Sequence, residues 1–110
     1  MLYAENLLKA DISTASSGDN TVIAAPTAPA YIAIDHINFI PTTAVTVQLK
    51  SGTTAYGGAY PLDAKQAFTI ENAFHSHRGV ITCAPGEAFV INLGGAVQTS
   101  GFVRYRIMNQ

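Results

Sequence analysis

His75-Ser76-His77 is the segment of this 110-residue chain with the clearest capacity for chemistry. Residues two apart on a β-strand project to the same face, so the two imidazoles could share a metal ion. Two ligands do not complete a site, and His36 or the same pair from three symmetry copies would have to supply the rest. A pair of solvated loop histidines next to Arg78 is the simpler interpretation. We therefore expect no metal and no cofactor, and keep His75 and His77 as the candidate metal ligands.

The other reactive side chains lack the partners that catalysis requires. Asp35 directly precedes His36, but neighbours on a strand face opposite ways, so the carboxylate is not expected to orient the imidazole. Cys83 is the only cysteine, which excludes an intrachain disulfide. With His75 or His77 it could form a nucleophile pair, yet no orienting residue or signature accompanies it. We expect a buried Cys83 and no enzymatic activity, with a small hydrolase as a rival.

Tyrosines and arginines offer binding rather than catalysis. Tyr31, Tyr56 and Tyr60 could stack on a sugar, as in a carbohydrate-binding module, although core or interface packing is the commoner use of such residues. Arg104 and Arg106 have the same parity on the last predicted strand, so we expect them to share an exposed face. From there they could pair with carboxylates of a neighbouring subunit, or simply be single surface arginines.

The elements that would position these residues are short β-strands. Over residues 44–50, Val45, Val47 and Leu49 alternate with polar residues, which is typical of a strand with one buried and one solvated face. Residues 68–71, 89–93 and 103–107 alternate in the same way, and turn formers separate such runs every ten or so residues. Six to eight such strands predict an all-β fold, an antiparallel β-sandwich or jelly-roll-like single domain.

Several local signals qualify this pattern. The apolar parity flips near Asp35 and His36, which indicates either a bulge or a strand covered on both faces. Gly57-Gly58 and Pro61 are expected to interrupt the strand that contains them, and Ser100-Gly101 to break the chain again. Gly94-Gly95 is expected to close a tight hairpin.

The first dozen residues differ from the rest. Tyr3, Leu7 and Ala10 have the spacing of a short amphipathic helix, but other apolar residues spoil a single stripe, so an extended arm is equally plausible. Turn formers at 13–20 then separate this segment from the body. We expect an N-terminal arm over residues 1–12 and a sandwich domain over 13–110. The candidate partner-interface residues are Tyr3, Leu7, Arg104 and Arg106.

The composition favours assembly over chemistry. Only 12% of the residues are charged while 48% are hydrophobic, and a soluble domain usually carries about a quarter charged residues. Such a surface is expected to be covered by copies or neighbours. The formal net charge of −1 arises from scattered single charges, so no stripe exists that would bind nucleic acid. No signal peptide and no apolar run of about 18 residues is found, so we expect no membrane association.

Two longer blocks carry a resemblance to a known group of proteins. Residues 17–25, Ser-Gly-Asp-Asn-Thr-Val-Ile-Ala-Ala, and residues 44–54, Ala-Val-Thr-Val-Gln-Leu-Lys-Ser-Gly-Thr-Thr, resemble a family of small structural proteins of tailed bacteriophages. Pro61-Leu62 and the segments 84–93 and 96–105 fall where that family has similar blocks. The resemblance covers roughly residues 13–106, but not the 26–29 turn or His75-Ser76-His77, and it names no active site.

The resemblance and the scarcity of charge together imply a virion structural protein. We expect a capsid decoration, or cement, protein, made in the bacterial host cytoplasm, that binds the major capsid protein on the capsid surface as a homotrimer. The arm would order on binding and add contact area. A tail or fibre module that binds a host-surface glycan through the tyrosines is the alternative.

Overall fold

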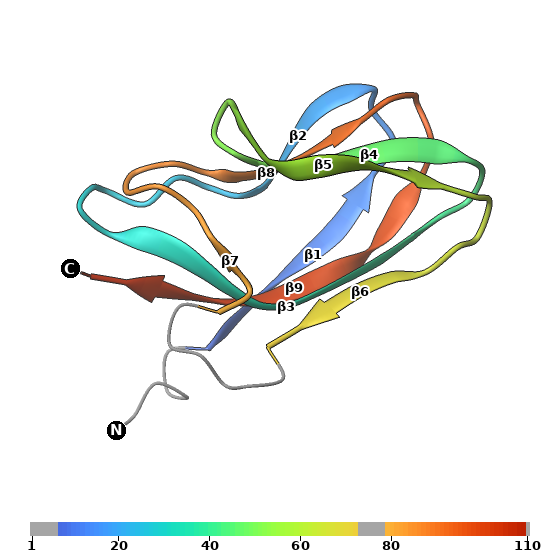
Figure 1. Ribbon diagram of the computed structural model, residues 1–110. Coiled ribbons are helices and arrows are strands. Elements are labelled where there is room, and N and C mark those ends of the chain that lie inside the picture. The colour runs from blue at the N-terminus through green and yellow to red at the C-terminus, as the bar shows by residue number, and fades with distance from the viewer. Residues whose placement is uncertain (1–6, 73–78, 110) are drawn as a thin grey trace.

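The computed structural model describes residues 7–72 and 79–109 of the chain, and within them every regular element is a β-strand. Two antiparallel sheets lie face to face, as the two layers of Figure 1 show. The predicted all-β sandwich is confirmed. The strands are β1 (Leu8–Thr14), β2 (Gly18–Ile23), β3 (Tyr31–Pro41), β4 (Val45–Ser51), β5 (Thr54–Leu62), β6 (Phe68–Glu71), β7 (Ile81–Thr82), β8 (Phe89–Leu93) and β9 (Thr99–Met108).

The strand order shows how the chain winds between the layers. The five-stranded sheet has the order β1-β9-β3-β6, with the short β7 also paired to β3, and the four-stranded sheet has the order β2-β8-β4-β5. Among the described strands, β4 and β5 are the only consecutive ones that pair directly. This wrapping of strands over two sheets matches the jelly-roll pattern in strand order.

The core lies between the sheets and follows from the alternation in the sequence. In β4 the side chains of Val45, Val47 and Leu49 are buried, while Thr46 is exposed. The rings of Phe39 and Phe68 stack with their centroids 4.7 Å apart, and Tyr60 packs on Phe68 from the other sheet. Side chains with no more than 2% exposure fill the centre: Phe39, Phe89, Ile32, Ile34, Ile37, Leu49, Ile81, Ile91, Leu93, Val47 and Val103.

Strand β3 explains the parity flip seen in the sequence. Its pairing with β9 shifts register between Ile34 and His36, so a bulge is present. In addition, the first four residues of β3, from Tyr31 to Ile34, are all buried, so both faces of this half are covered. The two explanations offered by the sequence therefore both apply.

Strand β5 corrects the expectation that Gly57-Gly58 and Pro61 interrupt it. It runs unbroken from Thr54 to Leu62 and forms one edge of its sheet. Thr46, opposite Pro61, accepts a hydrogen bond from Gly94 on its other side (2.8 Å). The backbone of Pro61 therefore turns to the open edge, where a missing N–H group breaks no ladder hydrogen bond.

The expectation of an arm or helix over residues 1–12 is wrong for residues 8–12. Leu8 to Thr14 pair with Tyr105 to Thr99, which makes β1 an edge strand of the five-stranded sheet. Ile12 is 2% exposed and belongs to the core. The inward side chains of Ala10 and Ile12 follow a two-residue period, which the helical spacing of Tyr3, Leu7 and Ala10 obscured.

Strand β9 corrects two further expectations. It passes through Ser100-Gly101 without a break. Gly94-Gly95 does not close a hairpin, because β8 and β9 belong to different sheets. A Cβ atom added to Gly101 would lie 1.9 Å from the carbonyl oxygen of Asn38, so this glycine allows a close approach of two paired strands.

Candidate functional site

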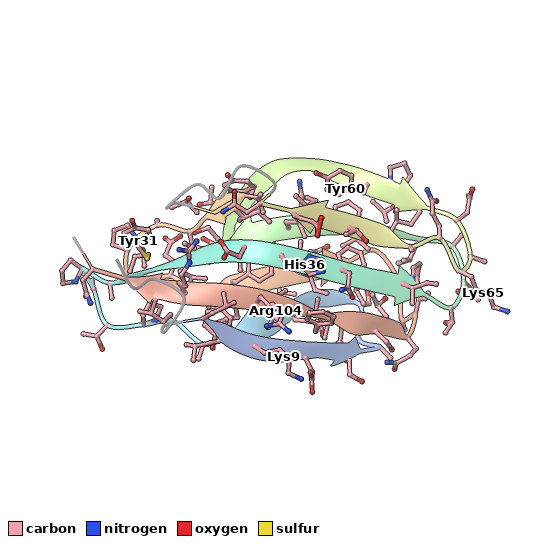
Figure 2. The ribbon with its side chains drawn as sticks, turned by 90° about the horizontal axis from the view of Figure 1, so that it is seen from below. Lys9, Tyr31, His36, Tyr60, Lys65 and Arg104 are labelled. Atoms are coloured by element: carbon pink, nitrogen blue, oxygen red, sulfur yellow. The ribbon has the colours of Figure 1, made fainter. Side chains whose placement is uncertain are left out.

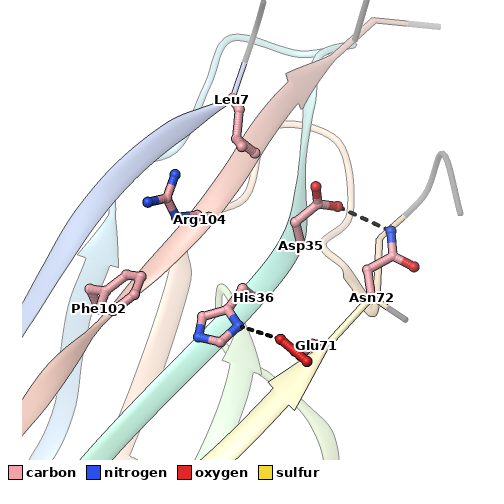
Figure 3. A pocket seen from close by; sticks show the side chains of 7 residues that line it. All are labelled: Leu7, Asp35, His36, Glu71, Asn72, Phe102 and Arg104. Carbon is pink, nitrogen blue, oxygen red and sulfur yellow. Dashed lines mark hydrogen bonds and ion pairs between the residues drawn. The ribbon is translucent and has the colours of Figure 1, made fainter. Parts of the chain in front are cut away.

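A well-formed hollow lies on the outer face of the five-stranded sheet. Figure 2 views this face, with Lys9, Arg104 and His36 in a row across neighbouring strands. The row follows from the register, since Arg104 is opposite Lys9 on one side and His36 on the other, and His36 is opposite Glu71. The hollow has a volume of about 440 Å³ and is lined by Leu7, Asp35, His36, Glu71, Asn72, Phe102 and Arg104 (Figure 3).

The β3 bulge places two consecutive side chains in this hollow. Asp35 and His36 both line it, so the expectation that they face opposite ways is wrong. The reason is the register shift between Ile34 and His36, since a bulge interrupts the strict alternation of side chains. The related expectation, that Asp35 does not orient His36, agrees with the contacts. The carboxylate of Asp35 is bound by Arg106 and Asn72 instead.

Arg106 is not on an exposed face, which corrects the prediction for this residue. Its side chain is 6% exposed and forms an ion pair with Asp35, whose side chain is 25% exposed. The amide Nδ2 of Asn72 also donates to Asp35 (3.2 Å). Strand parity correctly puts Arg106 on the same sheet face as Arg104. However, Arg106 is opposite Ala33, in the part of β3 whose two faces are both covered, so its side chain is buried. Arg106 is therefore occupied within the fold.

His36 is held by neighbours on three sides. The Asn38 amide nitrogen forms a hydrogen bond with Nε2 (2.9 Å), and Nδ1 lies 3.7 Å from Oε2 of Glu71. The His36 ring stacks with Phe102, with centroids 5.3 Å apart and planes inclined by 27°. Residues 7–72 and 79–109 contain no group of three or more potential metal ligands.

Arg104 is exposed, as predicted, and lies above an aromatic ring. Its guanidinium carbon is 5.9 Å from the centroid of the Phe102 ring. A guanidinium in this position is attracted to the ring face. Leu7, another predicted interface residue, is half-buried at the rim of the same hollow. Tyr3, His75 and His77 lie outside the described residues.

Cys83 is buried, as expected, and its surroundings disfavour a thiolate. The side chain is 2% exposed, and burial raises the thiol pKa to about 11. The nearby Ser51 hydroxyl donates to Oε1 of Glu87 (2.7 Å) and accepts from the backbone N–H of Ala84 (2.9 Å). A thiol of this kind is a poor nucleophile at neutral pH.

The three tyrosines do not form one platform. Tyr31 is 7% exposed and lies on the five-stranded sheet, whereas Tyr56 and Tyr60 lie on β5 of the other sheet. Tyr60 is half-buried against Phe68. Only Tyr56, at 38% exposure, offers a substantial open surface among the three.

The outer face of the four-stranded sheet is a second surface, which residue-by-residue reading of the sequence did not find. Its side chains are those of opposite parity to the core: Asp19, Thr21, Thr46, Gln48, Lys50, Ala55, Ala59, Pro61, Val90 and Asn92. We call this set the neutral face. All but two of these residues are uncharged, Val90 is only 5% exposed, and Thr46 and Pro61 border a hollow of about 310 Å³ at one end of the face.

The two charges on the neutral face neutralise each other. Nζ of Lys50 lies 3.0 Å from both carboxylate oxygens of Asp19, and Nδ2 of Asn92 donates to Asp19 (2.7 Å). The hydrogen bond from Asn92, followed by that from Lys50, holds the pKa of Asp19 below its usual value. The Asp19 carboxylate therefore stays ionised at neutral pH beside the Lys50 ammonium, and the face carries no net charge.

Comparisons with known proteins give no match: no family model, no curated protein and no solved structure is similar to this chain. The residues described contain no helix long and apolar enough to cross a membrane.

Proposed function

We propose that this chain is a virion structural protein of a tailed bacteriophage that decorates the capsid and reinforces contacts between major capsid subunits. It acts without catalysis and without a cofactor, as a homotrimer on the capsid surface, after synthesis in the bacterial cytoplasm. The observation that carries the proposal is the neutral face. A surface with no net charge can be buried against another protein without leaving an unpaired charge in the interface.

The pairing of charges within the molecule also supports a role in assembly. Three lysine and arginine side chains are ion-paired with aspartates in the same chain: Lys9 with Asp11, Lys50 with Asp19 and Arg106 with Asp35. Ion pairs of this kind at a surface add little stability. Their effect is that a chain already poor in charge presents few charges to a neighbour, which suits repeated contacts in a symmetric lattice.

The fold is compatible with this role but does not establish it. Jelly-roll sandwiches occur in viral capsid proteins and in lectins, among other classes, and a fold alone does not define a function. The attachment arm proposed for residues 1–12 is limited to the residues ahead of Leu8, because β1 begins there. Arg106 is buried in an ion pair with Asp35 and is no longer an interface candidate, whereas Arg104 is exposed on the sheet face opposite the neutral face.

The proposal is tested by adding one charge to the neutral face. Thr46 is an exposed residue of that face on β4, and Thr69 is an exposed threonine on the outer face of the other sheet, which makes Thr69→Arg a matched control. Purified variants are mixed with capsids that lack this protein, and the bound fraction is measured by co-sedimentation. We expect Thr46→Arg to weaken capsid binding by roughly tenfold or more, since it buries an unpaired charge.

Thr69→Arg should bind capsids as the unchanged protein does. Both variants should keep the far-ultraviolet circular dichroism spectrum of the unchanged protein, because both positions are exposed. Equal capsid binding by Thr46→Arg and Thr69→Arg would remove the neutral face from the docking surface. Failure of the unchanged protein to bind any capsid would reject the decoration role itself.

The alternative of a glycan-binding tail or fibre module loses the tyrosine platform on which it was based. Tyr31 is buried, so it cannot contact a sugar together with Tyr56 and Tyr60. A glycan site on this protein would have to be built from other residues.

A further inference from the structure

We propose that the hollow on the outer face of the five-stranded sheet is a binding site for an uncharged sugar residue. The proposal does not depend on the decoration role, since the hollow and the neutral face lie on opposite outer faces of the sandwich. A decorating protein would thus dock through one sheet and display the hollow on the other.

The first argument is the shape and the aromatic floor of the hollow. Its volume of about 440 Å³ falls within the range of roughly 300–1,000 Å³ that is typical of small-ligand sites. The rings of His36 and Phe102 stack, with centroids 5.3 Å apart and planes inclined by 27°, so together they form one aromatic cluster beside the hollow. A pyranose has one face rich in C–H groups, which packs well on aromatic rings, while its hydroxyls point outward.

The second argument is the set of polar groups around that floor. Glu71, with a side chain that is 65% exposed, and Asp35 offer carboxylate oxygens, and Arg104 offers guanidinium N–H groups (Figure 3). These planar groups accept from, or donate to, two adjacent hydroxyls at once. A sugar has many hydroxyl groups in fixed directions, so it can use both the donors and the acceptors of this site. A purely apolar ligand would use neither.

The third argument is the charge balance, which defines the ligand as uncharged. Glu71 and Arg104 are paired by register with His36 from opposite sides, so one negative and one positive group flank the ring. Asp35 is already neutralised by Arg106. A phosphate or carboxylate ligand would be attracted by Arg104 but repelled by Glu71. A cation would be attracted by Glu71 but repelled by Arg104. Neither sign of charge is favoured.

The fourth argument is that the site is rigid before any ligand arrives. His36 is fixed by Asn38 and faces Glu71, and both ring-bearing residues lie on the adjacent strands β3 and β9 within the sheet. Side chains held in this way lose little conformational entropy on binding, which favours even a weak ligand.

The test uses the full chain, labelled with ¹⁵N and titrated with neutral oligosaccharides of glucose, galactose, mannose and N-acetylglucosamine, and with an acidic oligogalacturonate. Because the aromatic floor recognises the C–H face that pyranoses share, the panel need not contain the natural glycan. We expect the amide signals of His36, Phe102 and Arg104 to shift with at least one neutral sugar. The amide signals of Thr46, Gln48 and Ala59 on the neutral face should not move.

Variants then separate stacking from a general surface effect. Phe102→Ala should weaken binding of the responding sugar by about tenfold, while Phe102→Tyr should keep it within about twofold. Tyr56→Ala, which removes the exposed tyrosine, and Thr46→Arg should leave sugar binding unchanged. If Phe102→Ala does not fold, the shift map of the unchanged protein still decides where the sugar binds.

The proposal is overturned if no amide around the hollow shifts with any neutral sugar, if Phe102→Ala binds as tightly as the unchanged protein, or if oligogalacturonate binds more tightly than every neutral sugar. Its failure would leave capsid binding untouched. Conversely, a protein that binds sugar through Phe102 and does not bind capsids would reject the decoration role alone.

Discussion

The thiol of Cys83 shows how burial decides the behaviour of a single residue. The sequence predicted a buried cysteine because free cysteine is among the most buried residue types, and the structure confirms it. Burial raises the thiol pKa to about 11. A group whose pKa is higher in the folded state keeps its proton there while the unfolded chain loses it, so folding stability falls as the pH rises between the two values.

We expect the free energy of unfolding to decline between about pH 9 and pH 11, by up to roughly 3 kcal/mol, because of Cys83. Urea denaturation across this pH range measures the effect. In Cys83→Ala the part of the decline due to the thiol should be absent. A decline of the same size in that variant would assign it to other groups.

Arg106 illustrates what strand parity cannot reveal. Its parity is that of Arg104, yet one arginine is buried and the other exposed. The difference arises because the first half of β3, which Arg106 faces, is covered on both sides. The sequence contained a signal of this, since the apolar residues from Tyr31 to Ile34 are nearly continuous, but not the identity of the residue that would pair with Asp35.

Removing one partner of the Asp35–Arg106 pair should be costly. Asp35→Ala leaves a guanidinium that is 6% exposed without its carboxylate, and we expect a loss of roughly 3 kcal/mol in the free energy of unfolding. The double variant Asp35→Ala/Arg106→Met should lose less than the sum of the single variants, as measured in a urea double-mutant cycle. Additive losses would show that the two side chains are not coupled.

At the scale of strands, the sequence predicted where the strands lie better than which strands pair with one another. The alternation in 44–50, 68–71 and 89–93 gave β4, β6 and β8 nearly to the residue. Several errors came from Gly and Pro, which do not break the strands at Gly57-Gly58, Pro61 and Gly101, and one came from the helical spacing of Tyr3, Leu7 and Ala10. Pro61 is tolerated because β5 is an edge strand, and Gly101 is required because β9 approaches β3 closely at that position. Neither fact can be derived from the sequence until the order of the strands is known.

Gly101 should therefore be sensitive to the smallest side chain. In Gly101→Ala the new Cβ would meet the backbone of Asn38 and Phe39, and we expect a loss of about 2 kcal/mol or more in stability. Gly95→Ala is the matched control, because no atom lies within 4 Å of a Cβ built there. Thermal denaturation should show a clearly lower Tm for Gly101→Ala than for Gly95→Ala. Equal Tm values would mean that the strands can separate at no cost.

At the scale of the whole molecule, the two outer faces of the sandwich differ in character. One carries an aromatic pair and polar groups around a hollow, and the other has a single ion pair and no net charge. The sequence could predict the low total charge, but the division between faces depends on which strands share a sheet. His36, Phe102 and Glu71 come from three strands separated in sequence, and only their register brings them together.

The central claim is that the molecule belongs to a phage capsid, with its neutral face against the shell. Electron microscopy of phage particles assembled in the presence of this chain tests the claim most directly. The account predicts density for the sandwich on the head surface, in three-fold groups at fixed stoichiometry, with Thr46 toward the shell and His36 away from it. Particles whose heads lack this density, or in which the sandwich is found at the tail, would contradict it.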